Sequence, residues 1–144
     1  MTKVNLEHLN ITVPDPDRTA AMLERLFGWH VRWSGPSMGG GYTVHVGTDT
    51  DYLALYRPAD PSRLEPFQKV RASGRVGGLN HIALTVDDLE DAETRILEAG
   101  FETLNHADYA PGRRFYFYDH DGIEYEVVSY QPAMSPMEWA SINK

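Results

Sequence analysis

Two side chains that commonly bind metals lie on strand-like segments of the chain. His81 belongs to the run Leu79–Val86, which alternates apolar and polar residues with the period of a β-strand. Glu126 belongs to the second of two aromatic and β-branched runs that flank an Asp/Gly turn, a pattern typical of a hairpin. If the first strand lies beside the hairpin, the imidazole and the carboxylate can project from the same face of one sheet. Such a pair would supply two of the three protein ligands of a divalent-metal site.

The third candidate ligand, His8, follows from an internal repeat. The segment Leu6–Val13 matches Leu79–Val86 position for position, so His8 corresponds to His81. After each segment come an acidic stretch, a helical pattern that ends at a glycine, and a hairpin. Two copies of one supersecondary unit therefore organise the chain.

Each repeat is expected to place an amphipathic helix directly after its first strand. Asp15 or Asp17 can cap the first helix; Asp87 can cap the second, with Glu90 three residues later as in a capping box. The apolar residues of the first strand must face this helix, so the polar set that includes His8 faces the opposite side. The apolar stripe of the second helix comprises Leu89, Ala92, Ile96 and Leu97.

These patterns predict an α+β fold in a single domain, made of two modules of strand, helix and two or three further strands. Module 1 spans about residues 4–58, a linker residues 59–78, module 2 about residues 79–131, and a C-terminal tail residues 132–144. Within the linker, a short helix is expected around residues 66–72. Within module 2, residues 105–114 are expected to form a long loop. Neither module would bury enough apolar surface alone, so the two should share a core or pair with a partner chain.

The composition excludes several classes of function. With 21 acidic and 13 basic residues the chain carries a net charge of −8, which disfavours nucleic acids and anionic membranes as partners. There is no cysteine, so disulfides, thiolate ligands and cysteine nucleophiles are excluded, as fits a cytoplasmic protein. The chain contains no run of 18 apolar residues, so no membrane span is predicted. We expect a cytoplasmic protein with a small-molecule partner.

Superposing the repeats gives four equivalent positions on one face, occupied by His8, Ala54, His81 and Glu126. Two imidazoles and a carboxylate that leave coordination positions open are the ligand set of non-haem Fe(II) oxygenases. Histidines on strands also occur as ordinary packing residues, so the residue types alone leave metal binding and packing both open.

The paired modules and these residues resemble the vicinal-oxygen-chelate superfamily, which includes glyoxalase I, extradiol dioxygenases, fosfomycin-resistance transferases, methylmalonyl-CoA epimerase and bleomycin-binding proteins. The resemblance covers residues 5 to about 131. It implies two βαβββ modules that form a cup-shaped, curved mixed sheet with the helices on its outer face, a divalent metal on His8, His81 and Glu126, and a homodimer. Glyoxalase I carries a carboxylate where this chain has Ala54, which argues against lactoylglutathione lyase activity.

Within the superfamily, the ligand set resembles those of the extradiol dioxygenases and the fosfomycin-resistance enzymes. Tyr116, Asp119 and Gly122 before Glu126 fit the dioxygenase signature, with His120 in place of its proline. The leading expectation is an extradiol-type ring-cleaving dioxygenase with Fe(II), with Mn, Ni or Zn as alternative metals. The alternatives are a glyoxalase-type lyase or isomerase, a fosfomycin-type thiol transferase, and a metal-free drug-binding protein like the bleomycin-resistance proteins.

The dioxygenase hypothesis gives roles to other polar residues. His106 or His45 would handle protons, because imidazole titrates near working pH. Tyr116 would donate a hydrogen bond to the substrate oxygen nearest the metal. The expected substrate-binding residues are Asn10, Tyr52, Tyr56, Tyr118 and Arg114. For the tyrosines the alternative is ordinary packing on a sheet, and for Arg114 it is a solvated basic pair with Arg113.

Overall fold

The computed structural model describes residues 1–109 and 112–130; the expected tail therefore lies outside the described residues. The chain divides into two compact units, Met1–Glu65 (unit 1) and Pro66–Lys144 (unit 2). Across the described residues, no helix is long and apolar enough to cross a lipid bilayer.

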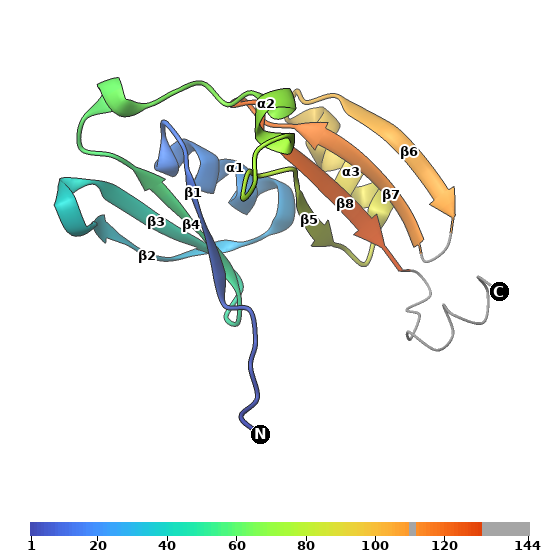
Figure 1. Ribbon diagram of the computed structural model, residues 1–144. Coiled ribbons are helices and arrows are strands. Elements are labelled where there is room, and N and C mark those ends of the chain that lie inside the picture. Colours follow the sequence, from blue (N-terminus) through green and yellow to red (C-terminus); the bar gives the residue numbers. More distant parts are fainter. Residues whose placement is uncertain (110–111, 131–144) are drawn as a thin grey trace. The chain divides into compact units, whose positions relative to one another are not determined.

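Unit 1 is a four-stranded mixed sheet with one helix packed on one face (Figure 1). The strand order is β1-β4-β3-β2, with β1 parallel to β4 and the other neighbours antiparallel. In chain order its elements are β1 (His8–Thr12), α1 (Pro16–Phe27), β2 (His30–Pro36), the 3₁₀ turn η1 (Met38–Gly40), β3 (Tyr42–Gly47), β4 (Tyr52–Arg57) and the 3₁₀ turn η2 (Pro61–Arg63).

Unit 2 repeats this topology. Its sheet has the order β5-β8-β7-β6, again with the first strand parallel to the last and the other neighbours antiparallel. Its elements are α2 (Lys69–Ser73), β5 (Ile82–Thr85), α3 (Leu89–Glu98), β6 (Thr103–Tyr109), β7 (Gly112–Tyr118) and β8 (Glu124–Ser129). The α+β class, the two strand–helix–three-strand modules and the short linker helix are thereby confirmed.

The helices α1 and α3 each bury an apolar stripe against the sheet of their own unit. In unit 1, Leu23 and Leu26 of α1 are buried, as are Val44 and Leu55 of the sheet. Full burial of one such side chain stabilises the folded state by about 1.5–3 kcal/mol. Gly28 ends α1 in the left-handed conformation at φ 68°, as the sequence predicts.

The core of unit 2 is aromatic. Phe115, Phe117 and Tyr125 are fully buried together with Ile96 of α3, and the rings of Phe117 and Tyr125 stack with centroids 5.0 Å apart. The prediction that Leu97 belongs to the buried stripe is wrong, because Leu97 is 51% exposed. Ile96 alone points toward the sheet at that turn of α3.

Two further predictions about unit 2 are wrong. Asp88, not Asp87, is the N-cap of α3, because its carboxylate accepts a hydrogen bond of 3.0 Å from the backbone N–H of Asp91. Residues 105–114 do not form a long loop; most of them belong to β6 and β7, which pair as a hairpin. The polar composition of this segment hid the strand character, because β6 is an edge strand that shows much of its surface to solvent.

Candidate metal centre

His81 and Glu126 meet on the face of the unit 2 sheet that is turned away from α3. His81 directly precedes β5, and Glu126 lies on β8, the neighbouring strand. The Nε2 atom of His81 lies 3.3 Å from Oε2 of Glu126. The side chains are 33% and 10% exposed, respectively. The imidazole and the carboxylate therefore converge, as the sequence pattern predicts, at the open edge of a largely buried site.

The register of the two sheets also agrees with the repeat. In unit 1, Asn10 of β1 pairs with Ala54 of β4; in unit 2, Ala83 of β5 pairs with Glu126 of β8. Ala54 therefore occupies the position in unit 1 that Glu126 occupies in unit 2. Because alanine has no donor atom, unit 1 can contribute only His8 from these four equivalent positions.

Two residues of β7, Arg114 and Tyr116, lie beside the carboxylate of Glu126. Arg114 Nη1 donates a hydrogen bond of 2.8 Å to Glu126 Oε1, opposite the oxygen that faces His81. Tyr116 pairs with Glu126 across the strands, and its ring meets the ring of His81 edge-on at 5.8 Å. Burial raises the pKa of Tyr116, and the negative charge of Glu126 and a hydrogen bond to its carboxylate raise it further, so the hydroxyl stays protonated.

A third group of contacts reaches the other side of the His81 ring. His81 Nδ1 lies 2.7 Å from Oδ1 of Asn80. The ammonium of Lys69, on α2, lies 3.0 Å from the same oxygen and also binds the backbone carbonyl of Asn80 and the carboxylate of Glu124. Lys69 thus neutralises a buried glutamate and fixes the amide beside His81.

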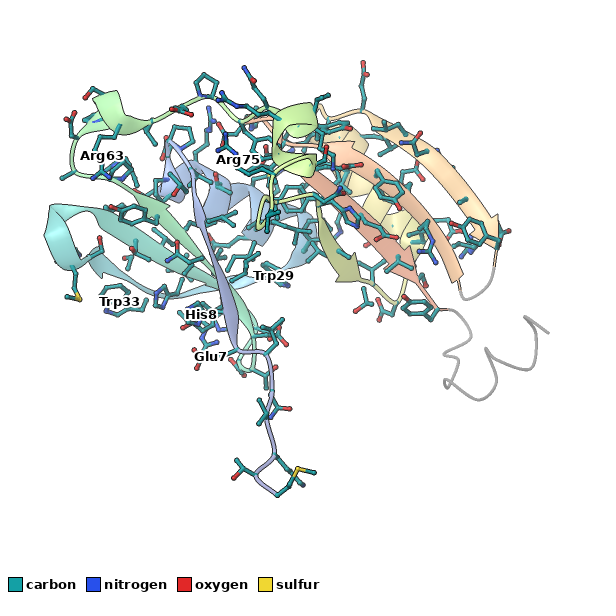
Figure 2. All side chains as sticks on the ribbon, viewed as in Figure 1. Glu7, His8, Trp29, Trp33, Arg63 and Arg75 are labelled. Carbon is teal, nitrogen blue, oxygen red and sulfur yellow. The ribbon has the colours of Figure 1, made fainter. Side chains whose placement is uncertain are left out.

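In unit 1, His8 lies in an aromatic cluster on the face of the sheet away from α1. Its ring stacks on Tyr52 with centroids 4.9 Å apart and lies 6.4 Å from the ring of His45. Figure 2 shows Glu7 and His8 together at the start of β1. His8 Nδ1 lies 2.8 Å from Oε1 of Glu7, which also accepts a hydrogen bond of 3.1 Å from the Tyr52 hydroxyl. The hydrogen bond with His8, and to a smaller extent the one from Tyr52, lower the pKa of Glu7.

The cluster extends to β2 and β3. The Trp33 ring, labelled in Figure 2, lies 5.1 Å from the ring of His45 and is 48% exposed. The guanidinium of Arg32 lies 4.3 Å above the ring of Tyr52. Burial lowers the pKa of His45, and the nearby charges of His8 and Arg32 lower it further. His45 is therefore a neutral imidazole at neutral pH that can accept a proton.

His106, the other candidate for proton transfer, lies on the opposite face of its sheet from Glu126. Its Nε2 lies 2.7 Å from Oε1 of Glu93 on α3, and its ring packs 5.7 Å from that of buried Phe115. A bulge between Leu104 and Ala107, with Asn105 at φ 55°, turns His106 toward the helix. The structure therefore does not bring His106 to His81 and Glu126.

The other residues predicted for the site lie on the open faces of their own sheets. Cross-strand pairing places Asn10, His45, Tyr52 and Tyr56 on the face of His8, and Arg114, Tyr116 and Tyr118 on the face of Glu126. Arg114 binds Glu126, and its Nε and Nη2 have no hydrogen-bond partner among the residues that the structure describes.

The donor chemistry of His81 and Glu126 fits a divalent cation. Neighbouring ligands that bind one ion at about 2.0–2.2 Å lie roughly 3.0–3.5 Å apart in tetrahedral or octahedral geometry. The separation of 3.3 Å between His81 Nε2 and Glu126 Oε2 lies in this range. Among the residues that the structure describes, no group of three or more His, Asp or Glu side chains is arranged to hold a metal ion.

Sequence reasoning missed four residues of these two faces: Glu7, Arg32, Asn80 and Lys69. A signal for two of them was present, because the residue before each histidine carries a side-chain oxygen in both repeats. Lys69 and Arg32 come from segments that the repeat does not relate to the histidines, so only the folded chain reveals their contacts.

Comparison with known protein sequences shows a relative that matches part of the chain. Over 94 residues the chain is 32% identical to the mitochondrial methylmalonyl-CoA epimerase of Dictyostelium discoideum; the match covers 64% of this chain and 55% of that protein. The chain thus spans about half the length of this relative.

Solved structures share the fold at low identity. A glyoxylase/bleomycin resistance protein/dioxygenase domain from Frankia sp. EAN1pec superposes with a TM-score of 0.73 and 20% identity, over 90% of this chain and 99% of that one. The fosfomycin resistance protein FosX from Listeria monocytogenes, complexed with Mn(II) and sulfate, gives 0.67 and 20%, over 95% and 98%. The antibiotic-binding protein TnmS3 from Streptomyces sp. CB03234 gives 0.67 and 17%, over 90% and 98%.

The strongest assignment comes from the family comparison, because it covers most of the chain. Residues 5–127 match the family described as the glyoxalase/bleomycin resistance protein/dioxygenase superfamily, and both repeats lie within that range. The chain belongs to this superfamily.

Proposed function

We propose that the protein is a metal-dependent enzyme in which His8, His81 and Glu126 hold one divalent cation and a small molecule binds that cation through two adjacent oxygens. One observation carries the proposal: the His81 imidazole and the Glu126 carboxylate converge at 3.3 Å on the open face of their sheet. The shared register of the two units supports His8 as the third ligand, because it holds the position of His81 in unit 1.

The ligand set suits several divalent metals. Imidazole and carboxylate donors bind Fe, Mn, Ni and Zn, and three protein ligands leave positions for substrate. A relative of the same fold was crystallised with Mn(II), which supports a divalent cation. We propose Fe(II) for the ring-cleavage reaction and use Mn(II) as the probe for the site itself. When bound, such a cation acts as a Lewis acid that polarises the substrate oxygens.

The residues around the proposed ligands would orient the substrate and move protons. The protonated Tyr116 hydroxyl would donate a hydrogen bond to a substrate oxygen beside the metal. His45 would accept a proton, because it is a neutral imidazole on the same face as His8. Arg114 would keep the Glu126 carboxylate in place through Nη1.

Proton transfer next to a carbonyl is the reaction that we place first, ahead of ring cleavage. The 32% identical relative is an epimerase, and His106, a residue expected to handle protons in ring cleavage, points toward α3 and Glu93. Extradiol ring cleavage stays the second candidate, because His8, His81 and Glu126 are the ligand types of Fe(II) oxygenases.

One pair of assays separates these reactions. Metal-loaded protein is incubated in D₂O with acyl-CoA thioesters that carry an acidic α-hydrogen, including methylmalonyl-CoA, and deuterium incorporation is followed by mass spectrometry. Parallel samples receive Fe(II) and a panel of catechols in an oxygen electrode. Deuterium incorporation that is lost in Glu126→Gln supports proton transfer; oxygen uptake with a yellow product supports ring cleavage. No reaction in either assay, with no metal bound, would contradict the proposal.

A metal-free binding protein is the alternative from a different class. The antibiotic-binding structural neighbour and the open aromatic cluster of Trp33, His45 and Tyr52 favour it. In that case His81→Ala would leave the binding of an aromatic ligand unchanged, whereas the enzyme proposal predicts loss of metal-dependent binding.

A further inference from the structure

The two proposed histidine ligands share a feature that concerns their other ring nitrogen. In each unit, Nδ1 of the histidine lies within hydrogen-bond distance of a side-chain oxygen of the preceding residue: 2.8 Å for His8 and Glu7, 2.7 Å for His81 and Asn80. Glu7 and Asn80 are different residue types at equivalent positions of the repeat. What the two side chains share is an oxygen atom that accepts a hydrogen bond.

The contacts of Lys69 establish which atom of the Asn80 amide faces His81. An ammonium group has only donors, so the amide atom 3.0 Å from Lys69 Nζ must be the oxygen. That same oxygen lies 2.7 Å from His81 Nδ1, and a carbonyl oxygen can only accept. The proton of this hydrogen bond therefore belongs to His81 Nδ1.

The ammonium is itself held in place by two further acceptors. Lys69 also binds the backbone carbonyl of Asn80 and the carboxylate of Glu124, which is 8% exposed. The amide of Asn80 cannot turn its NH₂ group toward His81 without placing that group against the ammonium. In unit 1, a carboxylate at Glu7 needs no such support, because both of its oxygens accept.

From these contacts we propose that Asn80, fixed by Lys69, and Glu7 are positioning residues that hold His81 and His8 in the Nδ1–H tautomer and so leave each Nε2 lone pair for the metal. A metal-bound histidine generally donates its other N–H to a carbonyl or carboxylate, which sets the ring orientation and the ligand basicity. The metal-binding part of this inference rests on the proposed function; the tautomer does not.

The first experiment uses the metal-free protein. Long-range ¹H–¹⁵N spectra recorded at alkaline pH, where imidazoles are neutral, report which nitrogen carries the proton, and His81→Asn identifies the His81 signals. We expect the Nδ1–H form of His81 in the wild-type protein and in Asn80→Asp, which keeps an oxygen acceptor. In Asn80→Leu, which has a similar shape and no acceptor, we expect a mixture of tautomers. An Nε2–H form of His81 in the wild-type protein would overturn the inference.

The second experiment measures Mn²⁺ binding by the same three proteins. Loss of an orienting partner commonly weakens metal affinity by about 10–100-fold, so N80L should bind in that range below wild type while N80D binds as wild type does. Equal affinity and an equal tautomer in N80L would overturn the inference although the metal site stands. If the wild-type protein binds no Mn²⁺, the proposed function fails, and the spectra of the metal-free protein still decide the tautomer.

Discussion

At the scale of single residues, the carboxylate of Glu126 has three polar partners, Arg114, His81 and Tyr116. Oε1 accepts a hydrogen bond from Arg114, and Oε2 faces His81. A buried ion pair of this kind tolerates removal of one partner poorly, because the remaining charge is left without compensation.

Substitution of the two adjacent arginines of β7 tests this arrangement. Arg114→Met should destabilise the metal-free protein by about 3–5 kcal/mol, because Arg114 and Glu126 are 14% and 10% exposed and the glutamate loses its partner. Arg113→Met is the matched control, since Arg113 binds Glu90 on the surface, where such a pair contributes about 0–1 kcal/mol. Urea unfolding of both variants gives the comparison. Equal losses would contradict the buried pairing.

Asp119 yields a prediction about pH. Burial raises its pKa, although the backbone N–H groups of Ile123 and Asp121 donate to it and act in the opposite direction. A raised pKa means that the folded chain holds this proton more tightly than the unfolded chain. Stability is therefore lost as the pH rises from the ordinary carboxyl pKa through the raised one.

Asp119→Asn should remove this dependence, because its amide stays neutral. The free energy of unfolding of D119N, relative to wild type, should increase across that pH window and then stay constant. Urea denaturation at a series of pH values measures it, with Asp49→Asn as the control because the Asp49 side chain is 94% exposed. A difference that is independent of pH would contradict the assignment.

At this scale the sequence predicted the convergence of His81 and Glu126, whereas His8 as the third ligand stays a prediction. His81 and Glu126 meet as expected because each lies on the open face of a strand whose alternate residues must face the helix. The orientation of His106 could not be predicted, because the bulge at Asn105 shifts the alternation of β6. No residue type in the segment indicates such a bulge. Lys69 was beyond reach for a different reason, since its partners lie 11 and 55 positions away along the chain.

At the scale of elements, the two helices fix the faces of the two sheets. Each begins at an aspartate that caps the first turn, Asp15 for α1 and Asp88 for α3. Asp87 and Asp88 are adjacent and chemically identical, so composition could not separate them. The backbone decides, because Asp88 is extended directly before α3 and its side chain reaches the N–H of Asp91.

The adjacent pair provides a matched test of this cap. Asp88→Ala should lower the free energy of unfolding by about 1 kcal/mol, within a range of about 0.5–2 kcal/mol for loss of an N-cap. Asp87→Ala should change it by less than about 0.5 kcal/mol, as surface substitutions usually do. Thermal or urea unfolding of the two variants measures both losses. A larger loss in Asp87→Ala than in Asp88→Ala would identify Asp87 as the cap.

The strand order could be predicted only in part at this scale. The first strand and the closing hairpin of each module are recognisable from their alternation. The edge strand β6 was predicted as a loop, because its exposed, polar residues lack the β-branched pattern of an inner strand. The parallel pairing of β1 with β4 and of β5 with β8 follows from long-range contacts that the local pattern does not encode.

At the scale of the whole molecule, the duplication of one module explains both the fold and the proposed site. The two sheets have the same strand order and register, so equivalent positions face equivalent directions within each unit. Superposition of the repeats gives His8 the position in unit 1 that His81 holds in unit 2.

A homodimer is the assembly that we predict. Among the described residues β1 and β5 are edge strands of their sheets, and Leu9 on β1 is 45% exposed; an exposed strand edge can pair with another chain. Light scattering coupled to size-exclusion chromatography should give twice the mass of one chain at micromolar concentration. The mass of a single chain at that concentration would contradict it.

Metal affinity tests the central claim most directly. Chelator-treated protein is titrated with Mn²⁺ while free Mn²⁺ is followed by electron paramagnetic resonance. We predict one site per chain in the wild-type protein and in the surface control His30→Ala. We expect affinity to fall by more than about 100-fold in His8→Ala, His81→Ala and Glu126→Gln, beyond the loss caused by removing an orienting partner. A wild-type protein without a stoichiometric site, or variants that bind as wild type does, would contradict the account.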